Sequence, residues 1–368
     1  MRTAIVTLAN IAEPTVRQLQ TALPEARVYG RVNRVRHCDE AFELASVLLP
    51  QLYREGVRIV GVCSSGILMR CLGPALADKH REPPVLAVAS DGSSVVPLIG
   101  GHRGANALAR DLASALGGHA AITTAADVTL GVALDEPRAG YRLATPEHYP
   151  NAVSRLLAGE PLRHDSDAPP VVGEGGDSLP RGDGTLGITV TSEALPSERG
   201  ELHYAPLDHV LGVGCERGCS AEELRTLALD TLAAHGISRH AIAAVTSLDL
   251  KSDEPAVHAL AAELGVPARF FSREALAAEA PRLANPSAIV AAEVGVPGVA
   301  EAAALAAVGP AGRLVVEKCK SARATCAVAT RQSGVFESVE FGRSRGTLHL
   351  IGTGPGQPDW RLPAVEQV

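Results

Sequence analysis

Short apolar segments alternate with helix-forming segments along this chain, and that alternation restricts the folds open to it. In the first part, residues 3–8, 58–62 and 85–89 are short apolar runs, while 13–23 and 106–116 have the apolar spacing of helices. Strands and helices of this length in alternation are typical of a parallel or mostly parallel sheet with helices on both faces. We therefore predict a doubly wound α/β domain for this part.

The same pattern returns after residue 210, where apolar runs and helical segments alternate again. Between the two parts, residues 169–184 contain so many glycines and prolines that neither a helix nor a long strand is expected there. We predict an α/β fold with two three-layer α/β domains, over 1–126 and 207–332. A small, partly irregular middle region with a flexible linker over 127–206 would separate them.

Composition excludes several classes of function. A net charge of -7 with interspersed signs gives no basic stripe, so nucleic acid is not expected as a partner. The chain has no signal-like start and no long apolar run, which predicts no membrane association and a cytoplasmic location. The seven cysteines lack zinc-site spacing, so we expect reduced thiols and no metal site.

The densest motif of the first domain is the glycine loop Gly100-Gly101-His102-Arg-Gly104, which leads into a helix carrying Asn106. Glycines let backbone N–H groups approach a ligand, and a helix N-terminus favours negative charge, so this loop suits a carboxylate or phosphate. The alternative is an ordinary tight turn with a surface histidine and Asn106 near the helix cap. Spacing alone leaves both open.

Ser64 and Ser65, beside Gly66 and followed by Arg70, form another turn from a strand into a helix. Their hydroxyls are candidate ligand donors, and an ordinary N-cap is the alternative.

In the second domain, residues 212–220 join a strand to a helix and include Gly214 and Cys215. The loop resembles an anion-binding loop but lacks a dinucleotide fingerprint and a Walker lysine. Cys215 stands where a nucleophile could, although a packed thiol is the default. Ser220 and Glu223 form a capping box.

Two charged clusters complete the candidates. Asp249, Lys251 and Glu254 follow a strand, at the end where open α/β sheets bind ligands. Lys251 is a candidate general acid or clamp, or part of a solvated charge cluster. Lys318 and Lys320 suit a polycarboxylate, or belong to an exposed basic loop.

Several segments, in this order, resemble the cobalamin-biosynthesis CbiG family of cobalt-precorrin-5A hydrolases, and those of the second half are also similar to the stand-alone CobE proteins. The similar segments are 66–79, 84–88, 100–109 and 122–127 in the first half, and 212–218, 247–255, 293–305 and 318–329 in the second.

The resemblance implies hydrolysis of the ring-A lactone of cobalt-precorrin-5A, with release of acetaldehyde to give cobalt-precorrin-5B. This chemistry needs a base for water, donors for the tetrahedral oxyanion and acid assistance. We expect His102 as the base, Asn106 with the loop amides as oxyanion donors, and Lys251 as a third catalytic residue. The expected substrate-binding residues are Ser64, Ser65, Arg70, Lys79, Gly100, Gly101, Gly104, Gly214, Cys215, Asp249, Glu254, Lys318 and Lys320. Cobalt would belong to the substrate, so no cofactor is expected.

Residues 346–368 resemble the start of a tetrapyrrole methyltransferase, in particular precorrin-3B C17-methyltransferase. Only a first strand and loop are present, so no methyl transfer is expected. The alternative functions are a non-catalytic carrier of corrinoid intermediates serving such a methyltransferase, or a fragment of a bifunctional enzyme.

Overall fold

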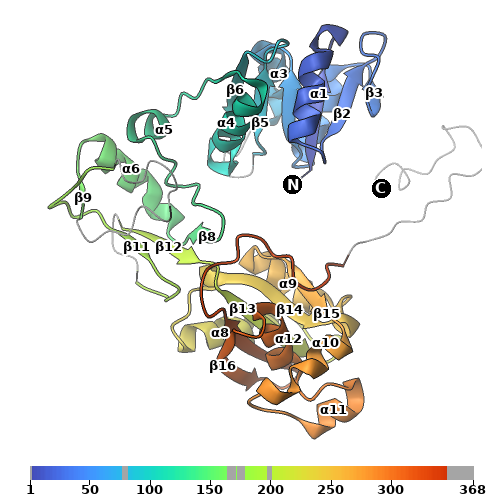
Figure 1. Ribbon diagram of the computed structural model, residues 1–368, viewed down its shortest axis with the longest axis vertical. Coiled ribbons are helices and arrows are strands. Elements are labelled where there is room, and N and C mark those ends of the chain that lie inside the picture. The colour runs from blue at the N-terminus through green and yellow to red at the C-terminus, as the bar shows by residue number, and fades with distance from the viewer. Residues whose placement is uncertain (1, 77–81, 164–170, 172–178, 197–200, 346–368) are drawn as a thin grey trace, which may run out of the picture. The chain divides into compact units, whose positions relative to one another are not determined.

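The structure is a computed structural model that describes the chain except for residues 1, 77–81, 164–170, 172–178, 197–200 and 346–368 (Figure 1). Most of the predicted linker over 169–184, and all of the predicted methyltransferase start, therefore lie outside the described residues. The chain forms two compact units. Unit 1 comprises Met1–Arg138, Thr145–Thr189 and Arg199–Leu202, and unit 2 comprises Ala139–Ala144, Val190–Glu198 and His203–Val368. Residues 127–206, predicted as a separate middle region, are thus divided between the units.

Unit 1 contains a seven-stranded sheet of order β3-β2-β1-β4-β5-β6-β7. Strands β1 to β5 are parallel, whereas β6 runs antiparallel to β5, and β7 is parallel to β6. The strands are β1 (Thr3–Thr7), β2 (Arg27–Arg31), β3 (Glu40–Phe42), β4 (Arg58–Val62), β5 (Val85–Val88), β6 (Ser94–Ile99) and β7 (His119–Ala120).

The direction of β6 follows from the tight turn that precedes it. The N–H of Gly92 donates to the carbonyl of Ala89 at 2.9 Å, and Gly92 adopts a φ of 76° that favours glycine. Because β6 returns antiparallel, it ends at the edge of the sheet where the parallel strands begin. The loop after Ile99 therefore lies at the opposite edge from the loops that follow β1 to β5.

Helices cover both faces of this sheet. Helices α1 (Glu13–Ala22) and α4 (Ala105–Leu116) pack on one face, in a core that includes Leu19 and Leu112. Helices α2 (Ala45–Arg54) and α3 (Ser65–Leu72) pack on the other, in a core that includes Leu49 and Leu68. Further along the chain, α5 and α6 and the short pair β9 and β10 complete the unit. These elements are α5 (Ala125–Leu130), α6 (Tyr149–Leu157), β9 (Leu162–Arg163) and β10 (Arg181–Gly182).

Unit 2 contains a five-stranded sheet of order β15-β14-β13-β17-β16. Strands β13 to β15 are parallel, β17 is antiparallel to β13, and β16 is antiparallel to β17. The strands are β13 (His209–Cys215), β14 (Ile242–Leu248), β15 (Ala268–Phe271), β16 (Arg313–Lys320) and β17 (Ala324–Thr330). A separate three-stranded sheet has the order β11-β12-β8, formed by β8 (Tyr141–Leu143), β11 (Ile188–Val190) and β12 (Leu202–Pro206).

Helices cover both faces of the five-stranded sheet too. Helices α8 (Ala221–Ala234) and α9 (Pro255–Leu264) pack on one face. Helices α10 (Arg273–Ala278) and α12 (Val299–Val308) pack on the other, preceded along the chain by α11 (Ala288–Val294). Helix α12 packs so closely that a Cβ on Gly212 would lie 2.0 Å from the carbonyl oxygen of Ala300. The predicted α/β fold is confirmed.

After β17, residues 331–345 cross unit 2 and reach its outer strand β15. Arg343 exchanges two backbone hydrogen bonds with Phe270. The guanidinium of Arg345 then donates to the carbonyl of Ser252 at 3.2 Å. We call residues 331–345 the strap. Among the described residues, no helix is long and apolar enough to cross a membrane.

Candidate functional site

The glycine loop of unit 1 has the shape that an anion site needs. Gly100 and Gly104 adopt φ angles of 79° and 91°, and a Cβ on Gly100 would lie 2.9 Å from Pro84. Between them lies a single 3-10 turn, η3 (Gly101–Arg103), which holds His102. The N–H of Gly104 donates to the Oε1 atom of Glu136 at 2.8 Å. The loop predicted to hold a carboxylate therefore holds one that belongs to the chain itself.

Asn106 is buried beside this loop, with 4% of its surface exposed. Its Nδ2 donates to Thr124 Oγ1 at 2.9 Å and to Asp127 Oδ2 at 3.1 Å, and Arg110 pairs with the same Asp127. An amide nitrogen has two N–H donors, and both are engaged here. The structure thus does not present Asn106 as the free oxyanion donor that we predicted; its side chain joins α4 to residues 124–127.

Carboxylates surround this end of α4. Burial, followed by the charge of Asp135, raises the pKa of Glu136 to about 7, against the lowering effect of the Gly104 N–H. Burial and Asp135 also raise the pKa of the Tyr149 hydroxyl. Sequence reasoning missed Glu136, although Asp135-Glu136-Pro137 repeats the residue types of Asp-Glu-Pro at 253–255. A carboxyl that titrates near neutrality beside a histidine loop suits acid or base chemistry.

Ser64, Ser65 and Arg70 lie at the other edge of the unit 1 sheet, after β4. Ser64 is the N-cap of α3 but makes no side-chain capping bond. The Arg70 guanidinium folds back toward the start of its own helix, 3.3 Å from where a Cβ on Gly66 would stand. Because β6 is antiparallel, the structure separates these residues from the His102 loop. Lys79 lies outside the described residues.

In unit 2, the predicted residues come together at one edge of the sheet. Strands β13 and β14 end there, at Cys215 and Leu248, while β16 ends and β17 begins there, at Lys320 and Ala324. This edge collects Gly214, Cys215, Asp249, Lys251, Glu254 and Lys320. We call it the unit 2 loop edge.

Hydrogen bonds tie the loops of this edge to one another. The Arg217 guanidinium pairs with Asp253 and donates to the carbonyl of Leu250 at 3.1 Å. Arg323 pairs with Glu216 at 3.0 Å and donates to the carbonyl of Gly218 at 3.3 Å. The loops after β13, after β14 and before β17 are therefore held as one assembly.

Glu254 is the buried member of this assembly, with 1% of its surface exposed. Its Oε1 accepts the N–H of Gly218 at 3.1 Å. Its Oε2 has no hydrogen-bond partner among the described residues, and the nearest cation, the Nη1 of Arg217, is 3.9 Å away. Burying a carboxylate oxygen without a partner costs free energy, so Glu254 Oε2 is a candidate contact for a ligand donor at this edge.

Cys215 is poorly suited to act as a nucleophile, whereas Lys251 is well placed to bind an anion. Burial raises the pKa of the Cys215 thiol to about 11, against the lowering charge of Lys251, so the thiol is protonated at neutral pH and is a poor nucleophile. Lys251 closes the 3-10 turn η7 (Asp249–Lys251). Among the described residues, no carboxylate forms an ion pair with it. Its ammonium is therefore available to an anionic ligand.

The lysines of β16 also differ. The Lys318 ammonium donates to the carbonyl of Asn285 at 2.6 Å, and its backbone N–H donates to the buried carboxylate of Glu301 at 2.9 Å. Burial alone would raise the pKa of Glu301, but the N–H donors of Asn285 and Lys318 lower it overall. Lys318 is thus engaged within the protein, whereas Lys320 is exposed at the end of the strand.

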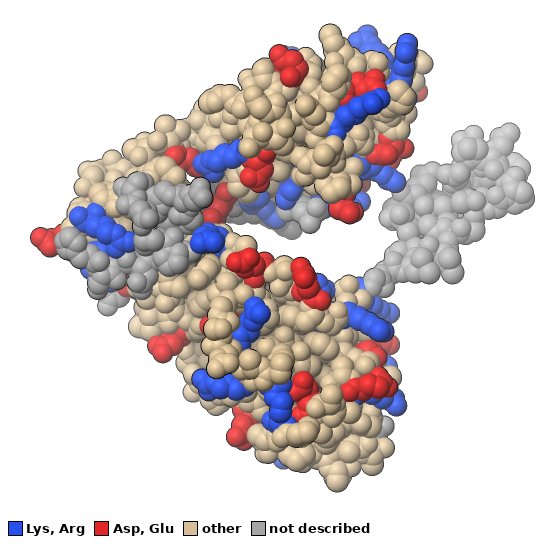
Figure 2. Space-filling view, viewed as in Figure 1, with Lys and Arg blue, Asp and Glu red and all other residues tan. Residues whose placement is uncertain are grey.

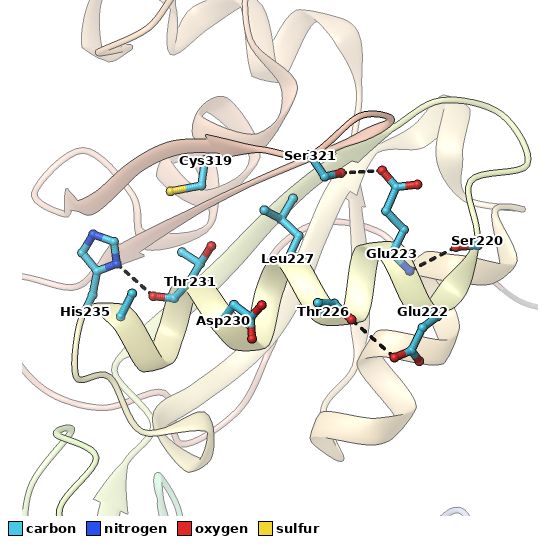
Figure 3. A pocket seen from close by; sticks show the side chains of 11 residues that line it. Ser220, Glu222, Glu223, Thr226, Leu227, Asp230, Thr231, His235, Cys319 and Ser321 are labelled. Atoms are coloured by element: carbon cyan, nitrogen blue, oxygen red, sulfur yellow. Dashed lines mark hydrogen bonds between the residues drawn. The ribbon is translucent and has the colours of Figure 1, made fainter.

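A groove of about 660 Å³ lies between α8 and β16 (Figure 3). Its lining includes the carboxylates of Glu222, Glu223 and Asp230, which would repel a polyanion. Glu223 is held there by Ser321 and by the backbone of Arg323. This groove holds none of the predicted substrate-binding residues. Among the described residues, no cluster of three or more His, Cys, Asp or Glu side chains is placed to hold a metal ion.

The fold defines a protein of two α/β units, each with loops at the strand ends of its sheet where a ligand could bind. Comparison with known proteins identifies its family. The model of the cobalamin synthesis G N-terminal region matches residues 47–127, and that of the C-terminus matches residues 209–329. A cobalt-precorrin-5A hydrolase from Priestia megaterium is 30% identical over 313 residues, which cover 77% of this chain and 81% of that protein. The chain belongs to the CbiG family of cobalamin biosynthesis proteins, as the sequence motifs predict.

Two further proteins are similar to this chain. Protein CobE from Sinorhizobium sp is 49% identical over 120 residues, which cover 33% of this chain and 78% of CobE. The crystal structure of a cobalamin biosynthesis protein G homolog from Sulfolobus solfataricus is 21% identical, with a TM-score of 0.34, and covers 90% of this chain and 97% of that chain.

Proposed function

We propose that this chain hydrolyses the ring-A lactone of cobalt-precorrin-5A, releasing acetaldehyde and giving cobalt-precorrin-5B, in the cytoplasm. The observation that carries the proposal is the 30% identity to the Priestia megaterium cobalt-precorrin-5A hydrolase over 81% of that protein. A second cobalt-precorrin-5A hydrolase, from Salmonella typhimurium, is also 30% identical, over 246 residues.

The reaction needs a base that activates water, donors for the oxyanion and an acid that assists departure of the two-carbon fragment. His102 remains our proposed base, because its glycine loop also holds the near-neutral carboxyl of Glu136. Lys251 is our proposed acid or clamp at the unit 2 loop edge, where its ammonium has no carboxylate partner among the described residues. Cobalt enters as part of the substrate, so the proposal includes no protein cofactor.

A non-catalytic role as a carrier of corrinoid intermediates is the second candidate. The 49% identity to CobE, confined to 33% of the chain, favours it, since a domain shared with a stand-alone protein has a function of its own. In this case, a precorrin methyltransferase would receive the ligand.

Acetaldehyde release by the purified full chain tests the proposal. We expect release that depends on cobalt-precorrin-5A, with a loss of at least about a hundredfold in kcat for His102→Ala, the range of a general base. Lys251→Met should lower kcat or raise KM by roughly tenfold or more. Lys318→Met serves as the matched control, because the Lys318 ammonium is already bound to Asn285.

Two results would contradict these assignments. Tight binding of cobalt-precorrin-5A without acetaldehyde release above background would replace the hydrolase with the carrier. Full turnover by His102→Ala would remove His102 as the base and leave the hydrolase standing.

A further inference from the structure

Exposed apolar side chains gather at one edge of the seven-stranded sheet in unit 1. Ile11 is 80% exposed, Leu44 57% and Val47 62%, and Val32 is also exposed. Ile11 follows β1, Val32 follows β2, and Leu44 and Val47 follow β3 at the start of α2. These three strands are neighbours and parallel, so the four residues follow strand ends that lie within roughly 10 Å of one another across the sheet.

Such clustering has a physical meaning. Single exposed apolar side chains are ordinary, but several on one small surface lose the free energy that burial would supply, about 25 cal/mol per Å². A cluster of this kind marks a surface that a ligand or partner covers.

Arginines border the same edge without acidic partners. Arg34 and Arg36 lie in the loop after β2, and Arg70 folds toward the start of α3 after β4. None of the three forms an ion pair with any described residue. At the opposite edge of the same sheet, Arg2 pairs with Glu55, and Arg27 pairs with Glu40. The three arginines at the apolar edge thus lack the ion pairs that Arg2 and Arg27 make at the opposite edge.

The arginine loop is fixed in place over this edge. The backbone N–H of Arg36 donates to Asn10 Oδ1 at 3.2 Å, which joins the loops after β2 and β1. Residues 35–38 fold over Gly30, where a Cβ would lie 2.8 Å from Val35 and Cys38. The nearby acid Glu13 is taken by Arg17 and His37. Figure 2 shows Lys and Arg side chains, with Asp and Glu side chains among them, at the end of unit 1 near β2 and β3.

The topology points to the same edge. Starting from β1, the chain adds β2 and β3 on one side of the sheet, and then β4 and β5 on the other. In open α/β sheets, ligands bind beyond the carboxyl ends of the strands where the order reverses. Here, that place lies between the loops after β1 and β4, which carry Ile11 and the Ser64–Ser65 pair.

We propose that this edge of unit 1 binds the flat face of a tetrapyrrole on Ile11, Val32 and Val47, while Arg34, Arg36 and Arg70 pair with its carboxylate arms. An apolar ring with anionic arms complements an apolar platform with a cationic border, in shape and in charge. The proposal rests on the proposed function for the class of ligand. Because the His102 loop lies at the opposite edge of this sheet, the proposal describes a binding site separate from the proposed catalytic base.

Fluorescence titration of the full chain with uroporphyrin III, a polycarboxylated tetrapyrrole, tests the proposal. We expect Arg34→Gln with Arg36→Gln to weaken binding about tenfold at low salt, and less at high salt, because exposed charges are screened. Ile11→Ser with Val47→Ser should weaken binding to a similar degree without changing the salt dependence.

The matched control is Arg27→Gln with Arg54→Gln, which removes the same charge from the opposite edge of the same sheet. Its affinity should stay within about twofold of the original, because screening confines exposed charges to short range. Equal weakening by both arginine pairs, unchanged binding in the Arg34 and Arg36 variant, or no uroporphyrin III binding at all would overturn the proposal. Equally tight binding of a short duplex DNA would also overturn it, by showing unselective attraction of polyanions.

The outcome is independent of the hydrolase. If the original chain binds uroporphyrin III through this edge and releases no acetaldehyde from cobalt-precorrin-5A, the proposed function fails and this inference stands. If acetaldehyde is released while the Arg34 and Arg36 variant binds uroporphyrin III as tightly as the original chain, the inference fails and the function stands.

Discussion

The glycine loops of the two units are held in the same way but sit in opposite electrostatic surroundings. In unit 1, the N–H of Gly104 donates to Glu136, and in unit 2 the N–H of Gly218 donates to Glu254. Each glutamate is the middle residue of an Asp-Glu-Pro triplet. Burial, followed by the charge of Asp135, raises the pKa of Glu136 to about 7, whereas Glu254 has Arg217 as its nearest cation among the described residues. The same local contact therefore involves a titratable carboxyl in one loop and a buried glutamate beside an arginine in the other.

The largest expected effect follows from removing the side chain of Glu254. Glu254→Ala leaves the Gly218 N–H without its acceptor in a buried place, so we expect the free energy of unfolding of unit 2 to fall by roughly 2–3 kcal/mol. Urea denaturation measures it, with Glu222→Ala on the exposed start of α8 as the control. A more stable Glu254→Ala variant would show that the unpartnered Oε2 outweighs the bond to Gly218, and that the residue is kept for function.

A smaller effect, dependent on pH, is expected for the titratable anion. Because the folded pKa of Glu136 is raised from 4.5 to about 7, its contribution to stability is complete below about pH 4.5 and is lost as the pH rises through about 7. Glu136→Gln should therefore stabilise unit 1 at about pH 8 by roughly 1–2 kcal/mol relative to the original chain, and by less at about pH 5. Thermal unfolding at both pH values measures the difference.

Glu160→Gln is the control for this experiment, because the pKa of Glu160 is shifted in the opposite direction to that of Glu136. A hydrogen bond from Arg155 lowers the pKa of Glu160 to about 2, so its contribution is present above about pH 4.5 and is lost only in acid. Its variant should be destabilised by the same amount at about pH 5 and about pH 8. If the difference in unfolding temperature between the Glu136→Gln variant and the original chain were the same at both pH values, Glu136 would not titrate between them.

The smallest expected effect tests whether the two loops are alike in their backbones. Gly104 and Gly218 have φ angles of 91° and 67°, and a Cβ on either would meet open space. Alanine at each position should cost about 1 kcal/mol through backbone strain alone. Gly73→Ala, without a positive φ and also in open space, should be close to neutral. Unequal losses for Gly104→Ala and Gly218→Ala would show that the loops differ in more than charge.

The sequence allows the layers to be predicted, because strands buried on both faces leave continuous apolar runs such as Arg58–Val62 and Ile242–Leu248. The predicted N-cap role of Ser220 is confirmed, since the Glu223 N–H donates to Ser220 Oγ at 3.1 Å, although the Glu223 carboxylate accepts from Ser321 and Arg323 and does not complete the capping box. The direction of β6 is not visible in its own apolar residues. Only the turn at Gly92 reveals it, and that one turn decides which residues share an edge with His102.

The candidate sites are harder to predict, because their partners are distant in sequence. Glu136 reaches Gly104 across 32 residues, and Glu254 reaches Gly218 across 36. Strand β2 begins and ends with arginine, so its apolar signal is weak, and the loop that carries Arg34 and Arg36 is easily overlooked. The roles predicted for His102, Lys251 and the other site residues stay predictions.

The strap limits where unit 2 can be truncated at its C-terminal end. The family model ends at residue 329 and our predicted domain at 332, yet Arg343 supplies the hydrogen bonds that cover the outer edge of β15. A chain shortened to residue 332 would present an open strand edge to its neighbours in solution, and such edges recruit strands from other chains. The limit of sequence similarity and the limit of a well-behaved folding unit therefore differ in this protein, by the length of the strap.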